Sequence, residues 1–115
     1  MSVTISDFSP TTKLSGGNKG LIRTKDKTSN ATVTGTGLAN GQYVEVLFPA
    51  KSKDPKYKWT GTTGGLNSET MECTVLLTQK LDEHGDRDKD DPATVSVTVG
   101  DSAATNFDTK TGTAP

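Results

Sequence analysis

The chain has 115 residues, of which 30% are hydrophobic and 23% are charged. Its 13 lysine and arginine residues nearly balance its 14 aspartate and glutamate residues, and the formal net charge is -1. This balance argues against a general attraction to nucleic acid or to an anionic membrane surface. The length predicts a single domain over 1–115, and the low apolar content predicts a thin core.

The single cysteine, Cys73, cannot form a disulfide within the chain, so the fold is expected to be stable without one. The N-terminal residues lack the basic and apolar regions of a secretory signal. No apolar run approaches the roughly 20 residues that span a bilayer. We therefore expect a protein that is made in a cytoplasm, with no membrane partner.

Apolar side chains alternate along the chain with a period of two, which is typical of strands that bury one face. Threonine and valine dominate these segments, and both residues favour strands. The residues expected to face inward are, in chain order, Val3 and Ile5, then Val33, then Val44, Val46 and Phe48, then Met71, Cys73, Val75 and Leu77, and finally Val95, Val97 and Val99.

Glycine-rich and asparagine-rich stretches separate these segments and predict turns at 15–20, 35–41, 61–65 and 100–102. Pro49, Pro55 and Pro92 are expected at strand ends, where a missing N–H does least harm. The stretch 78–91 is mostly charged and is predicted to be a solvated loop. Strands and turns at this spacing predict an all-β sandwich or barrel.

These segments together resemble the IPT/TIG branch of immunoglobulin-like domains. The resemblance is carried by "VTISDFSP" followed by "SGG", by "ATVTGTGL" (31–38), by "YVEVLF" (43–48), by "ETMECTVLL" (69–77) and by the closing "VSVTVGDSAATNF" (95–107). It implies an immunoglobulin-like β-sandwich of about seven antiparallel strands, with Phe107 inserted between the two sheets. The chain is also similar in its architecture to small immunoglobulin-like head-decoration proteins of bacteriophages.

An acidic run invites a calcium-site interpretation; it comprises Asp82, Glu83, Asp86, Asp88, Asp90 and Asp91. A calcium loop that begins at Asp86 needs glycine at its sixth position and glutamate at its twelfth, where this chain has Asp91 and Val97. Arg87 and Lys89 can neutralise the neighbouring carboxylates. We expect a solvated loop and no metal, with an ion site as the alternative.

Catalytic groups are scarce in this sequence. His84 is the only histidine, and it lies in the acidic run with no evident nucleophile beside it. Cys73 is expected to be a buried apolar residue instead of a reactive thiol. The glycine-rich turns lack the strand and helix context of a phosphate-binding loop. We therefore expect no enzyme activity, no catalytic residues and no cofactor.

The stretch "KSKDPKYKW" (51–59) is the strongest candidate for a binding surface. Basic residues interleaved with aromatic ones are suited to an acidic protein surface or to nucleic acid. The partner-binding candidates are Lys51, Lys53, Lys56, Tyr57 and Lys58. The alternative is that Trp59 is the core tryptophan of the fold and that the lysines only solubilise an edge loop.

These observations favour a non-enzymatic structural module of the virion, a capsid decoration protein bound in many copies to the major capsid protein or to another virion protein. The alternative is a recognition module on a phage tail that binds carbohydrate or a host-cell surface. Only one tryptophan and two tyrosines are present, which disfavours carbohydrate. Contact with nucleic acid is a third possibility, against which the net charge argues. The sequence leaves the oligomeric state open.

Overall fold

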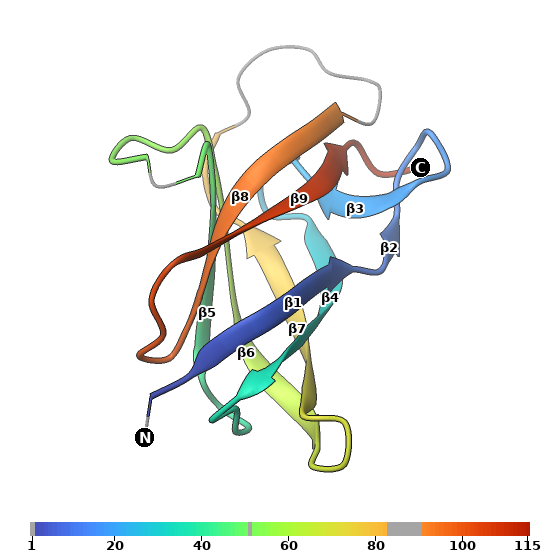
Figure 1. The fold of residues 1–115 in the computed structure, drawn as a ribbon. Helices are drawn as coiled ribbons and strands as arrows, with labels where there is room; N and C mark the ends of the chain where they lie inside the picture. Colours follow the sequence, from blue (N-terminus) through green and yellow to red (C-terminus); the bar gives the residue numbers. More distant parts are fainter. Residues whose placement is uncertain (1, 51, 83–90) are drawn as a thin grey trace.

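Strands make up all the regular structure in the computed structural model, which describes residues 2–50, 52–82 and 91–115 (Figure 1). Within those ranges no helix is present that could cross a membrane. The strands are β1 (Thr4–Pro10), β2 (Thr12–Lys13), β3 (Lys19–Ile22), β4 (Thr28–Thr36), β5 (Tyr43–Phe48), β6 (Tyr57–Asn67), β7 (Glu72–Gln79), β8 (Asp91–Val99) and β9 (Thr105–Gly112).

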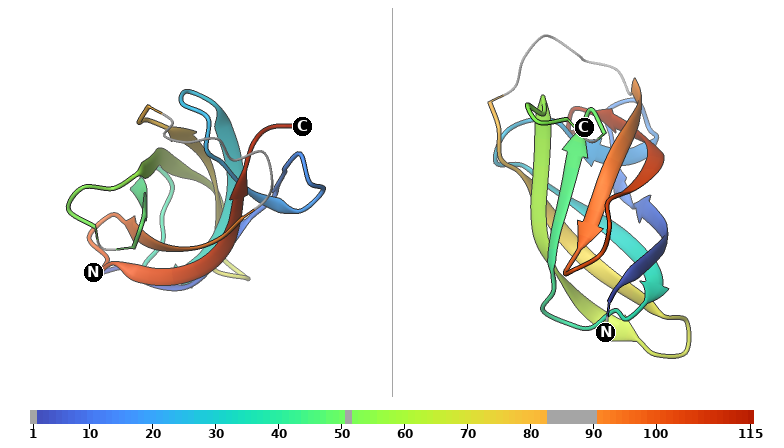
Figure 2. Two further views of the ribbon diagram at one scale, coloured as in Figure 1. Left: turned by 90° about the horizontal axis from the view of Figure 1, so that it is seen from above. Right: turned by 60° about the vertical axis from the view of Figure 1, so that its left-hand side comes forward.

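The strands form one mixed sheet in the order β1-β4-β7-β6-β5-β8-β9-β3-β2. Neighbouring strands are antiparallel except β3 and β9, which run parallel. The sheet coils on itself until β1 approaches β9, so that the molecule resembles a barrel when it is seen from above (Figure 2). The all-β prediction is confirmed. The predicted sandwich of two sheets with about seven strands is not confirmed. β5 pairs with both β6 and β8, so the strands form one continuous sheet.

The core lies inside the coiled sheet and is built from the inward faces of the strands. Trp59 and Tyr57 of β6 are its largest apolar members, at 0% and 1% exposure. Predicted inward residues that are buried are Val3, Ile5, Val33, Val44, Val46, Cys73, Val75, Leu77, Val95, Val97 and Val99. Period-two alternation therefore identified the buried face of the valine-rich strands correctly.

Several details of the sequence prediction are wrong. The predicted solvated loop 78–91 overlaps two strands, since Thr78 and Gln79 belong to β7, with Gln79 at 0% exposure, and Asp91 begins β8. Met71 is 37% exposed and lies in the turn before β7, with a left-handed φ of 57°. The stretch 61–65, which was expected to form a turn, lies in the middle of the long strand β6. Phe107 is only half-buried and packs at the rim of the core.

A seam separates β1 from β9, because no ladder joins these two strands, all of whose residues are described. A bulge between Ile5 and Asp7 bends β1, and Pro10 at its end has no N–H to donate. Side chains close the seam instead: the rings of Phe8 and Phe107 pack with their centroids 6.2 Å apart. The sheet therefore closes by apolar contact where backbone pairing stops.

The β8–β9 turn confirms the expected tight corner at 100–102. Gly100 has a left-handed φ of 55°, and the Ser102 amide donates to the Val99 carbonyl at 3.0 Å. The Asp101 carboxylate accepts a hydrogen bond from the Val3 amide at 2.9 Å. This turn therefore also holds the beginning of the chain against the sheet.

Candidate functional site

The basic stretch forms the loop between β5 and β6, at residues 49–56, and continues into β6. The Lys56 amide donates to the Phe48 carbonyl at 2.7 Å, and the Ser52 amide donates to the Pro49 carbonyl at 3.2 Å. Lys53 is exposed and Lys56 is half-buried. Lys51 lies outside the described residues. The loop thus holds its described lysines on a short, internally hydrogen-bonded segment above the barrel.

The aromatic residues of this stretch belong to the core and not to its surface. The ring of Tyr57 stacks on Phe48 at 6.1 Å and contacts the ring of Trp59 at 6.0 Å. The guanidinium of Arg23 lies over Tyr57, 5.9 Å from the ring centroid, and the Trp59 indole N–H donates to the Ile22 carbonyl at 2.7 Å. Tyr57 is therefore removed from the set of exposed partner-binding candidates, and Trp59 is the core tryptophan.

Lys58 points outward from β6 and joins a chain of polar contacts on the outer face of the sheet. Its ammonium lies 3.7 Å from the Glu45 carboxylate, which also accepts a hydrogen bond from the Tyr43 hydroxyl at 3.3 Å. Partial burial, the Glu45 charge and this hydrogen bond raise the pKa of Tyr43 above its ordinary value. The raised pKa favours the protonated phenol, which is the form that donates to Glu45.

Three large apolar side chains are exposed on β5, on β7 and in the turn that joins β6 to β7, and the sequence analysis did not identify them as surface residues. Tyr43 of β5 is 54% exposed, Leu76 of β7 is 53% exposed, and Met71 lies at the tip of the β6–β7 hairpin. Alternation contained the signal for Leu76, since it is out of phase with the buried Val75 and Leu77. Tyr43 begins β5 and Met71 follows the far end of β6, so these two residues lie at the end of the barrel opposite the basic loop (Figure 1). Exposed apolar groups of this size are common in protein-binding surfaces.

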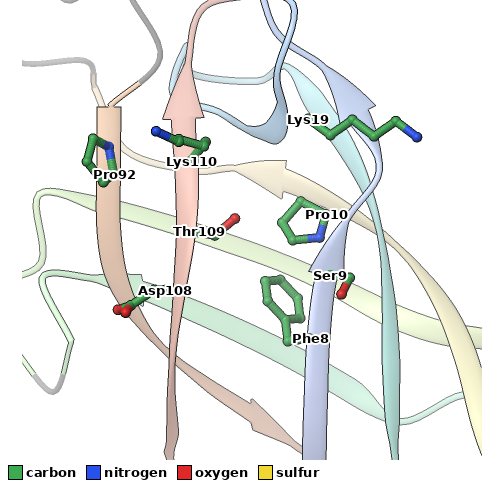
Figure 3. Close-up of a pocket in the computed structure, with 8 residues that line it drawn as sticks. All are labelled: Phe8, Ser9, Pro10, Lys19, Pro92, Asp108, Thr109 and Lys110. Carbon is green, nitrogen blue, oxygen red and sulfur yellow. The ribbon is translucent and has the colours of Figure 1, made fainter.

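A shallow pocket of about 380 Å³ lies at the seam. Figure 3 shows that Phe8, Pro10 and Thr109 point into the space between β1 and β9, whereas Lys19 points away from it. The Asp108 carboxylate accepts a hydrogen bond from the Thr94 hydroxyl at 2.7 Å. Apolar and polar residues both line the pocket, but its charged residues Lys19, Asp108 and Lys110 do not point to a common centre (Figure 3). The pocket geometry therefore does not specify a substrate.

A buried polar cluster holds the β3–β4 loop against the end of β7. Gln79 is fully buried, and its side-chain amide donates to the carbonyls of Arg23 and Leu81. The same side chain accepts a hydrogen bond from the Leu81 amide at 2.6 Å. Because every polar atom of this amide has a partner, we assign Gln79 a structural role.

The remaining candidates offer no reactive group in the part of the chain that the structure describes. Asp82 is exposed and pairs with Lys25 at 3.3 Å. His84 and the rest of the acidic run up to Asp90 lie outside the described residues, and the described ones contain no cluster suited to a metal ion. Burial raises the pKa of the Cys73 thiol, which opposes formation of the reactive thiolate.

No protein-family model matches the chain, and no curated protein or solved structure matches it. The described surface carries the basic loop where β5 ends and β6 begins, and it carries exposed apolar side chains separately from the loop, at Tyr43 of β5 and Leu76 of β7.

Proposed function

We propose that the chain is a non-enzymatic structural binding module of immunoglobulin-like type, and that it attaches in many copies to a bacteriophage capsid as a decoration protein. Its partner is the major capsid protein or another virion protein. The finer assignment to an IPT/TIG-like domain is part of the same proposal and rests on the sequence resemblance. The observation that carries the proposed function is the basic loop on a rigid β-scaffold.

The loop is suited to an acidic protein partner. The described part of the loop contains two lysines, Lys53 and Lys56, and a single carboxylate, that of Asp54, so its formal charge is positive. The aromatic residues below the loop are buried, so the lysines are held on a stable base instead of on a mobile tail. Loops on such scaffolds are common recognition sites. Complementary charge speeds encounter with an acidic surface and makes binding sensitive to salt.

Burial of the aromatic residues also bears on the alternative of carbohydrate recognition. Sugar-binding surfaces present open aromatic rings, but Tyr57 and Trp59 are buried and Phe48 is partly buried. Tyr43 is the aromatic side chain that is mostly exposed. One ring supports a protein contact better than it supports a platform for sugars.

Co-sedimentation with undecorated capsids, assembled from the major capsid protein encoded beside the gene for this chain, tests the proposed function. The test variant is Lys51→Glu, Lys53→Glu and Lys56→Glu combined. The matched control, Lys13→Glu, Lys19→Glu and Lys110→Glu combined, makes the same change in charge at exposed positions on β2, β3 and β9. We expect the wild-type chain and the control to sediment with capsids and the loop variant to remain in solution.

Circular dichroism establishes that each variant is folded. A folded loop variant that binds as well as the wild type excludes the loop as the contact. A wild-type chain that never sediments with the capsids contradicts the decoration function itself.

A further inference from the structure

The outer face of β7 carries a symmetric row of side chains. Glu72, Thr74, Leu76 and Thr78 of β7, and Lys80 directly after its last residue, alternate with the buried residues Cys73, Val75, Leu77 and Gln79. Of the outward-facing residues, Thr78 is half-buried and the others are exposed. The row has an acid at one end, a base at the other and a large apolar residue at its midpoint, with a threonine on each side of that residue.

The two ends of this row are available for a partner. Glu72 and Lys80 have no salt-bridge partner among the residues that the structure describes. A strand rises roughly 3.3 Å per residue, so the two residues lie about 26 Å apart along the strand direction, with Leu76 halfway between them. Leu76 exposes 53% of its surface to water at that midpoint, which is unfavourable for a large apolar side chain.

The midpoint continues sideways onto the neighbouring strands. Thr60 pairs with Thr78, and Thr63 pairs with Val75, so this register places Thr62 beside Leu76. Thr62 in turn pairs with Tyr43 of β5. The two exposed apolar side chains of the face, Leu76 and Tyr43, therefore lie in one row across the strands, on the two sides of Thr62.

We propose that this face binds a second copy of the same chain, with the two β7 strands antiparallel. The two-fold axis lies between the two copies. It is perpendicular to β7 and passes between the two Leu76 residues. Such an axis places Leu76 against Leu76 of the second copy, and Glu72 of each copy opposite Lys80 of the other. In an isologous interface each unlike contact occurs twice, so both ion pairs form together.

Charge complementarity identifies a second copy as the occupant. A partner of any other sequence needs a base opposite Glu72, an acid about 26 Å away opposite Lys80 and an apolar group between them. A second copy of β7 in the antiparallel direction presents this pattern, because Lys80, Leu76 and Glu72 then lie opposite Glu72, Leu76 and Lys80. The outer face of a coiled sheet is convex (Figure 2), so contact is confined to β7 and its neighbours. The dimer is therefore small and reversible.

Sedimentation equilibrium of the folded chain, at concentrations up to about 1 mM, measures this association. We expect a monomer–dimer equilibrium for the wild type. Leu76→Glu places two carboxylates at the midpoint and is expected to abolish the dimer. Asn106→Glu makes the same charge change at an exposed position of β9 and is expected to dimerise as the wild type does. A wild-type chain that is monomeric throughout, or a Leu76→Glu variant that still dimerises, overturns the proposal.

Charge reversal tests the antiparallel arrangement itself. Glu72→Lys or Lys80→Glu alone replaces two attractive pairs by two repulsive ones and should weaken the dimer roughly three- to thirtyfold. A chain with both substitutions should regain wild-type dimerisation. An equimolar mixture of the two single variants should associate more tightly than either alone, because the two lysines of one variant then face the two glutamates of the other. Failure of both rescues overturns the proposed arrangement.

Discussion

At the scale of single residues, Met71 occupies a backbone conformation that suits glycine. Its φ of 57° is left-handed, and its side chain is 37% exposed. A non-glycine residue in this region costs of the order of 1 kcal/mol or more. We expect Met71→Gly to raise the free energy of unfolding by about 1 kcal/mol in urea denaturation, because glycine adopts this φ without a steric penalty.

Met71→Ala is the matched control, since it removes the thioether side chain and retains the Cβ atom that causes the strain. It should leave the free energy of unfolding unchanged or lower it. Equal stabilisation by glycine and by alanine would show that removal of the side chain, and not relief of the backbone, is responsible.

At the scale of the strands, two glycines of β6 differ in how closely the backbone of β7 approaches them. A Cβ atom at Gly61 would meet the Leu76 carbonyl oxygen at 2.2 Å, whereas a Cβ atom at Gly64 would meet nothing within 4 Å. We expect Gly61→Ala to destabilise the fold by about 1–3 kcal/mol or more, because β6 and β7 must separate. Gly64→Ala should be neutral or stabilising by up to about 1 kcal/mol. Thermal unfolding of both variants measures the contrast, and equal melting temperatures would contradict it.

The seam between β1 and β9 is the second element-scale feature with a measurable consequence. Phe107 is half-buried, so Phe107→Leu is expected to cost less than the roughly 3–5 kcal/mol lost when a fully buried aromatic residue is truncated. Phe8→Leu and Phe107→Leu in a double-mutant cycle should show a coupling of about 0.5–1.5 kcal/mol, the range for paired rings. Additive effects of the two substitutions would mean that the rings do not close the seam together.

The strands that could be predicted from the sequence are those rich in valine. The strands that contain Val33, Val44, Val95 and their neighbours were recognisable, because these β-branched residues alternate with polar ones. The middle of β6 was predicted to be a turn, because Gly61 and Gly64 stand there in place of apolar residues and glycine by itself indicates a turn. β3 was missed because it is only four residues long and its apolar residues Leu21 and Ile22 are consecutive and both buried, so they do not alternate with polar ones.

The same reasoning explains what was predicted of the candidate site. Lys53 was expected at the surface and is exposed, since a charged residue in a loop between strands has no reason to be buried. Tyr57 was expected at the surface and is buried, because it is in phase with Trp59 on the inward face of β6. Alternation alone predicts which residues of β7 point outward. The strand register is needed to show that Leu76, at the centre of this row, lies in line with Thr62 and Tyr43 on the neighbouring strands.

At the scale of the whole molecule, the order of strands predicts a gradient of local stability. The strands β7, β6 and β5 each have a hydrogen-bonded neighbour on both sides, whereas β1 and β2 end the sheet. Trp59, Leu77 and Val46, on the three central strands, are all at 0% exposure. β1 is held by its ladder to β4 and by ring contact at the seam, so it can separate without disrupting these central residues.

Native-state amide hydrogen exchange, followed by NMR, tests this gradient strand by strand. The hydrogen-bonded amides of β6 and β7 should exchange only through global unfolding, which costs about 5–15 kcal/mol in domains of this kind. The amides through which β1 pairs with β4 should exchange through a smaller opening, with weaker dependence on denaturant, because separation of β1 exposes Val3, Ile5 and Phe8 but leaves the buried residues of β5, β6 and β7 packed. Phe107→Leu should lower the protection of β1 more than that of β6. If protection is equal in β1 and β6 and this variant lowers both equally, the sheet unfolds as one cooperative unit and the seam is not its weak point.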